Sequence, residues 1–107
     1  MTKYNSFESY YEVHLQELLK NYPIHFKRKE YDKCCEILKD LHQELSSKNA
    51  HPYAEVILQI FKNTWKGTVQ EIRNKLMSGI KTQKQIDAHW MFYEHLVDKI
   101  KLIRKRD

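Results

Sequence analysis

Apolar residues recur every three or four positions along almost the whole chain, and this spacing restricts the fold more than any other feature. Residues three or four apart share one face of an α-helix, whereas a half-buried strand alternates apolar and polar residues every two positions. No stretch of the sequence shows the two-residue alternation. We therefore expect an all-α fold, a compact antiparallel bundle of four longer helices and one short helix over about 6–22, 29–47, 52–66, 69–78 and 83–104.

Residues with strong preferences for helix ends indicate these boundaries. Ser6 can cap the first helix with its hydroxyl, and Pro23 is expected to end it. Pro52 suits the first turn of the third helix, where a missing N–H costs nothing. Thr68–Glu71 and Thr82–Gln85 both match the capping box, in which the cap and the third helical residue satisfy each other's amides.

The apolar stripes of the helices predict the core. The third helix has the widest apolar arc and should be the most buried. Trp90 and Tyr93 of the last helix are expected inside, against Ile57, Ile60 or Phe61. The first helix should bury Phe7, Tyr11, His14, Leu15, Leu18 and Tyr22, and the last helix Ile86, His89, Trp90, Tyr93, Leu96, Val97, Ile100 and Ile103.

A small apolar stripe is left on the outer face of the last helix. At about 100° per residue, Met91, His95 and Leu102 fall together on the side away from the predicted core. Such a stripe can contact another protein, and these three residues are our candidates for partner binding. The alternative is that they are ordinary surface residues, because single exposed apolar side chains are common.

Two clusters of basic residues are candidates for contact with a nucleic acid or another anion. The chain carries a net charge of +5. A basic tail can follow a nucleic-acid backbone, and cations beside a helix N-terminus can bind a phosphate. A solvated loop and a solubilising end are the alternatives. The clusters are Lys27, Arg28 and Lys29 before the second helix, and Lys99, Lys101, Arg104, Lys105 and Arg106 at the end of the last.

The sequence holds no recognisable catalytic, cofactor or metal motif. Cys34 and Cys35 fall toward the apolar side of the second helix, without a cationic neighbour on that side to activate a thiolate. Only two glycines occur, too few for a glycine-rich phosphate loop. The spacings of the histidines do not match a known zinc or di-iron motif. We therefore expect a protein that is not an enzyme and that needs no cofactor or metal.

These observations favour a single domain over 1–107, with 1–5 and 105–107 expected to fray. No apolar run is long enough for a membrane span and no signal peptide is evident, so we expect a cytoplasmic protein. The lysine-rich, alanine-poor composition is typical of an AT-rich genome such as that of a phage or mobile element.

The favoured function is binding of an unidentified protein partner, as an adaptor, inhibitor or immunity-type factor does. The alternative is a DNA- or RNA-associated regulator that uses the basic C-terminus. Self-association into a homo-oligomer stays open, because several helices have wide apolar arcs.

Overall fold

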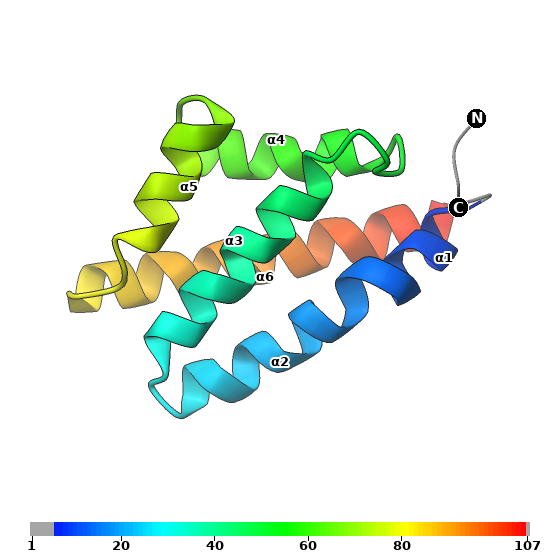
Figure 1. Ribbon diagram of the computed structural model, residues 1–107. Coiled ribbons are helices and arrows are strands. Elements are labelled where there is room, and N and C mark those ends of the chain that lie inside the picture. Colours follow the sequence, from blue (N-terminus) through cyan, green and yellow to red (C-terminus); the bar gives the residue numbers. More distant parts are fainter. Residues whose placement is uncertain (1–5, 107) are drawn as a thin grey trace.

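The computed structural model describes residues 6–106, and these residues form helices without any strand (Figure 1). The prediction of an all-α bundle is therefore confirmed. The prediction of frayed ends at 1–5 and 107 lies outside the described residues, whereas Lys105 and Arg106 belong to the last helix. The elements are α1 (Phe7–Tyr10), the π-helical turn η1 (Tyr11–Leu15), α2 (Gln16–Lys27), α3 (Tyr31–Leu45), α4 (Ala54–Thr64), α5 (Val69–Met77) and α6 (Gln83–Arg106).

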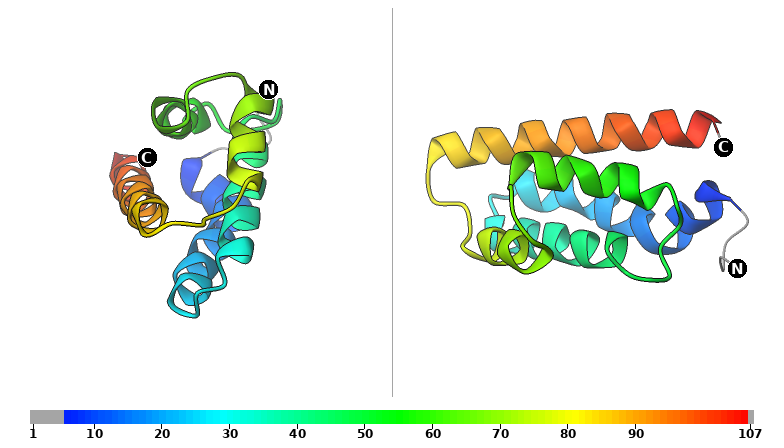
Figure 2. Two further views of the ribbon diagram at one scale, coloured as in Figure 1. Left: turned by 90° about the vertical axis from the view of Figure 1, so that its left-hand side faces the viewer. Right: turned by 90° about the horizontal axis from the view of Figure 1, so that it is seen from above.

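The long helix α6 runs along the length of the molecule. Seen from one end, α4 and the continuous α1–η1–α2 arm lie on either side of α6, and α3 closes the bundle opposite it (Figure 2). The short helix α5 packs against α3. Helix α6 therefore has α4 along one side and the arm along the other.

Three predicted caps are present. The Ser6 side chain accepts from the Ser9 N–H at 3.2 Å. Both halves of the capping box join Thr68 and Glu71 at the start of α5. Thr82 and Gln85 make the same reciprocal pair before α6, at 3.0 and 3.2 Å. These bonds satisfy amides that a helix N-terminus otherwise leaves free, which explains why α5 and α6 begin where the sequence predicted.

The prediction that Pro23 ends the first helix is wrong. Pro23 lies inside α2, which continues to Lys27. A proline in a helix lacks the N–H that would bond to the carbonyl four residues earlier, here that of Leu19. The Tyr93 hydroxyl of α6 donates to this carbonyl at 2.6 Å. The oxygen is thus satisfied from another helix, and α2 tolerates the proline.

The predicted stripe of the first helix is shifted by the π-helical turn. A π-helix inserts one residue per turn, so the residues on either side of it change register. The buried stripe of the arm steps by five residues from Tyr10 to Leu15 across η1, where a regular helix would step by three or four. Its buried apolar side chains are Phe7, Tyr10, Leu15, Leu19 and Tyr22, while Tyr11 and Leu18 are only partly buried.

The predicted neighbours of Trp90 and Tyr93 are also wrong. Both side chains are half-buried and pack against the arm, Tyr93 on Tyr22 at 4.5 Å between ring centroids and Trp90 on Phe26 at 4.8 Å. The aromatic residue that faces Phe61 of α4 is Phe92, which the predicted core face omitted. Helix α6 is therefore rotated relative to the prediction, so that its aromatic side chains pack against both α4 and the arm.

Candidate functional site

The three residues predicted to bind a partner all lie on the outer surface of α6. Met91 is 69% exposed and Leu102 is 51% exposed, and His95 is exposed as well. None of the three side chains makes a hydrogen bond or an ion pair within residues 6–106. The stripe therefore has the geometry expected of it, an apolar line along the outside of the longest helix.

Two residues of the stripe, His95 and Leu102, border the groove between α4 and α6. These helices run antiparallel, so the start of α4 meets the end of α6. Toward that end the groove is hollowed by about 160 Å³, between Tyr53 and Val56 on the α4 side and Leu102 and Ile103 on the α6 side. A wider hollow of about 450 Å³ continues along α4 toward His95. We call this continuous surface the α4–α6 face.

The α4 half of this face was not predicted from the sequence. Tyr53 is 43% exposed and Val56 is 41% exposed, although both belong to the apolar arc that was predicted to be buried. The sequence feature that could have indicated this exposure is the width of the apolar arc. A stripe wider than the neighbouring helices can cover leaves its edge in solvent.

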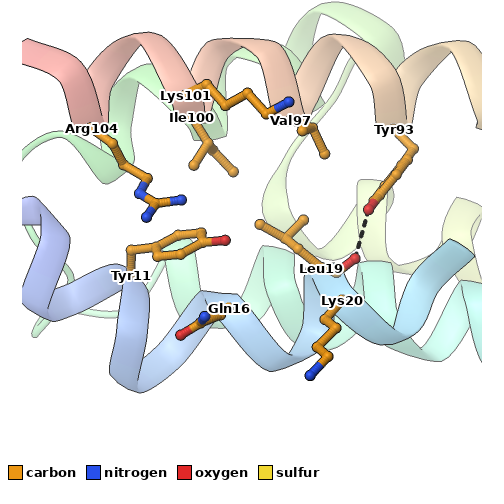
Figure 3. A pocket seen from close by; sticks show the side chains of 9 residues that line it. All are labelled: Tyr11, Gln16, Leu19, Lys20, Tyr93, Val97, Ile100, Lys101 and Arg104. Carbon is orange, nitrogen blue, oxygen red and sulfur yellow. Dashed lines mark hydrogen bonds between the residues drawn. The ribbon is translucent and has the colours of Figure 1, made fainter.

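A second groove separates α6 from the arm (Figure 3). It is a hollow of about 270 Å³ with Leu19, Val97 and Ile100 between the two helices. One end carries the Tyr93–Leu19 hydrogen bond (Figure 3). Burial, helped by Tyr11, raises the pKa of the Tyr93 hydroxyl to about 12, so it stays a donor at neutral pH.

Arg104, one of the predicted anion contacts, is occupied within the protein. Its Nε and Nη2 donate to the two carboxylate oxygens of Glu8 at 2.6 and 2.7 Å. The guanidinium also lies 4.1 Å from the ring centroid of Tyr11. Arg104 therefore ties the end of α6 to the arm, where a bidentate pair fixes both position and orientation.

The other C-terminal cations are divided between the two sides of α6. Helical residues seven apart share a face, so Lys99 and Arg106 lie together and line the α4–α6 groove. Lys101 lines the opposite groove, and Lys105 lies four residues beyond it. The basic tail is therefore two separate pairs of cations and one internal ion pair, because α6 stays helical to Arg106.

The other predicted cationic cluster lies far from this tail. Lys27 at the end of α2 and Arg28 and Lys29 in the connection to α3 are exposed, at the end of the molecule opposite the end of α6 (Figure 1). Lys29 adopts a left-handed φ of 60° there. The nearby His25 Nδ1 and Glu30 Oε1 are 2.9 Å apart, which brings the two sides of this tight turn together.

The two cysteines are buried in α3 and are not paired with each other. Burial, with a smaller effect of Cys35 and Glu30, raises the pKa of the Cys34 thiol to about 12. Burial and the charge of Asp32 raise the pKa of the Cys35 thiol to about 11. Thiols that stay protonated at neutral pH are poor nucleophiles and poor metal ligands.

In residues 6–106, no three or more His, Cys, Asp or Glu side chains gather where they could hold a metal ion. Over the same range, no helix is long and apolar enough to cross a membrane.

Comparisons with models of known protein families, with characterised proteins and with solved structures found no match.

Proposed function

We propose that this chain is a small binding protein that recognises another protein through the α4–α6 face. One observation carries the proposal. Of the large apolar side chains that are exposed, Tyr53, Val56 and Leu102 line one hollow of this face, although they come from segments far apart in sequence, and Met91 lies on the same side of α6 as Leu102. Contiguous apolar surface beside a groove is typical of a protein-binding site.

The remaining exposed apolar side chains support the choice of this face. They are spread over other elements, with Val13 in η1, Val69 and Met77 at the two ends of α5, and Ile24 in α2. Scattered residues of this kind are normal on any protein surface. The concentration on α4 and α6 is what distinguishes the proposed site.

The distribution of cations favours a protein partner over a nucleic acid. A nucleic-acid backbone is bound by cations that lie along one surface and neutralise successive phosphates. Here the loop cluster at Lys27–Lys29 and the C-terminal cations lie at opposite ends, and Arg104 is paired with Glu8. A DNA- or RNA-associated role stays the alternative, supported by the net charge of +5.

Site-specific photo-crosslinking in the source cells tests the proposal. A photoreactive amino acid is placed at Met91 and, as the matched control, at Met77, a second exposed methionine that lies on α5 away from the face. A discrete protein adduct from the Met91 position that is missing from the Met77 position supports the proposal. A nuclease-sensitive adduct supports the alternative, and no adduct from Met91 contradicts the proposal.

A further inference from the structure

We propose that the occupant of the α4–α6 face is an acidic amphipathic helix of the partner protein, which carries two carboxylates about two helical turns apart with a large apolar side chain between them. This inference rests on the proposed function and adds the chemistry of the partner. It follows from the shape, the charge and the length of the groove.

The shape of the groove suits a third helix. Two antiparallel helices form its walls, and its apolar surface comes from both of them: Tyr53 and Val56 from the α4 side, Leu102 and Ile103 from α6. A helix that lies in such a groove inserts its apolar face at positions i, i+3, i+4 and i+7. Helix α4 has 11 residues and so is about 16 Å long, which gives room for about three turns of a partner helix.

The charge of the groove is positive where the apolar surface is best formed. Lys99 and Arg106 line this hollow, and within residues 6–106 neither side chain makes an ion pair or a hydrogen bond. Among the same residues, no acidic side chain lines the hollow. The nearest acidic side chain of α4, Glu55, already faces Lys62 at 3.9 Å. Unpaired cations beside an apolar hollow are complementary to carboxylates beside an apolar anchor.

The spacing of the cations sets the spacing of the carboxylates. Lys99 and Arg106 are seven residues apart in α6, which is about 10.5 Å along the helix axis. Two carboxylates at i and i+7 of a partner helix parallel or antiparallel to α6 match this distance. The apolar anchor then lies at i+3 or i+4, opposite Val56 and Leu102.

Selection from a display library of 16-residue helix-forming peptides, with the full chain as target, tests the inference. The test variant is Lys99→Glu/Arg106→Glu. The matched control is Lys101→Glu/Lys105→Glu, which makes the same change of charge on the other side of α6. All four side chains are wholly or partly exposed, so both variants should keep the fold, and circular dichroism checks this.

Enriched peptides should carry two acidic residues about seven positions apart with a large apolar residue between them. Their affinity should fall about tenfold or more on the test variant and by less than about threefold on the control, since reversed charges near the contact act most strongly. Peptides without the acidic pair, an equal loss on both variants, or no enriched peptide would overturn the inference.

Two further outcomes separate this inference from the proposed function. A dimer in sedimentation equilibrium that Leu102→Glu dissociates would make a second copy of this chain the occupant and would overturn the inference. A protein adduct from the Met91 position together with a selection that yields no acidic peptides would leave the proposed function standing while the inference fails.

Discussion

The Tyr93 hydroxyl donates to the backbone carbonyl of Leu19 at 2.6 Å, and this carbonyl is the one that Pro23 leaves without its helical N–H. The bond joins α6 to α2 across 74 positions of sequence. The hydrogen bond missing from α2 at Pro23 and the packing of α6 against α2 therefore depend on the same carbonyl. A proline that breaks a helical hydrogen bond here provides an acceptor for the neighbouring helix.

A double-mutant cycle at these positions tests that coupling. Tyr93→Phe should cost about 1–3 kcal/mol of unfolding free energy, because it leaves a part-buried carbonyl without a donor. Pro23→Ala restores an amide that can donate to the same carbonyl. In the Pro23→Ala background the cost of Tyr93→Phe should therefore be clearly smaller. Urea unfolding of the four proteins measures this, and an equal cost in both backgrounds would show that the two residues act independently.

The helices of this fold could be predicted from the sequence because their signals are local. Capping residues at Ser6, Thr68 and Thr82 act within one turn, and the three- to four-residue spacing of apolar residues reports a helix whatever it packs against. These signals gave the all-α class and most helix boundaries. The end placed at Pro23 failed because the donor that rescues α2 comes from α6.

The register and neighbours of the helices could not be predicted, because both depend on distant contacts. A helical wheel assumes regular turns, so the extra residue of η1 moved the stripe from Tyr11 to Tyr10. A helical wheel also predicts which side of a helix is buried but not which helix packs against that side. Trp90 was therefore predicted to contact α4, whereas it packs on Phe26 of the arm. The exposed stripe that includes Met91 could be predicted because it lies on the side of α6 opposite the predicted core face. The half of the candidate site at Val56 could not be recognised, because Val56 belongs to the wide apolar arc of α4, which the sequence predicts to be buried.

The ion pair at the end of α6 is expected to contribute modestly to stability. Arg104→Ala removes the bidentate contact with Glu8 and the stacking on Tyr11. Both charged side chains are more than one third exposed, so the loss should be no more than about 1 kcal/mol, and smaller at high salt. Thermal unfolding at two salt concentrations measures it, with Lys105→Ala as the control. An unchanged midpoint in Arg104→Ala at low salt would contradict this assignment.

Truncation after Leu102 should be more harmful than Arg104→Ala. A purely solubilising tail, one of the alternatives left open by the sequence, would cost little stability when removed. The missing segment, however, includes Ile103, which is 8% exposed and belongs to the core cluster. Burial of an isoleucine side chain contributes about 1.5–3 kcal/mol. Urea unfolding of the truncated protein should therefore show a clear loss of stability, and a loss no larger than that of Arg104→Ala would return the tail to a purely solubilising role.

The buried histidine of α3 should make the protein sensitive to acid. His42 is 0% exposed, and neither ring nitrogen has a hydrogen-bond partner in the described chain. Burial lowers its pKa, with help from the charges of Arg73 and Lys62, and burial also lowers the pKa of His89. The unfolded chain, with histidines near 6.5, then binds more protons than the folded protein below that pH.

Stability should therefore change little between about pH 7 and 8 and should fall as the pH drops below about 6.5, toward the lowered pKa values of the two histidines in the folded protein. His42→Leu should flatten part of this dependence and should raise stability at neutral pH by about 1 kcal/mol, because it removes two buried polar atoms without partners. Urea midpoints of both proteins at pH 7.5 and 5.5 measure the effect. Parallel losses in the two proteins would show that His42 does not carry it.

The thiols of α3 should be unreactive until the protein unfolds. The pKa of Cys34 is raised to about 12 and that of Cys35 to about 11, so at pH 8 almost no thiolate is present, and both side chains are buried. A chromogenic disulfide reagent should label both thiols slowly in buffer and rapidly in urea. Rapid labelling of either thiol in the folded protein would show an accessible thiolate and would support the hypothesis of a catalytic cysteine in α3.

We propose that the α4–α6 face binds the partner, and a comparison of two matched double variants tests this claim. Val56→Glu/Leu102→Glu places charges on the face, and Val13→Glu/Met77→Glu places the same charges on exposed apolar residues elsewhere. The protein adduct formed from the photoreactive group at Met91 is quantified in both backgrounds. The face variant should lose at least about nine-tenths of the adduct, since buried charge at an interface costs well over about 1.4 kcal/mol, while the control variant should keep it. Equal amounts of adduct in both, or a loss in the control alone, would contradict the claim.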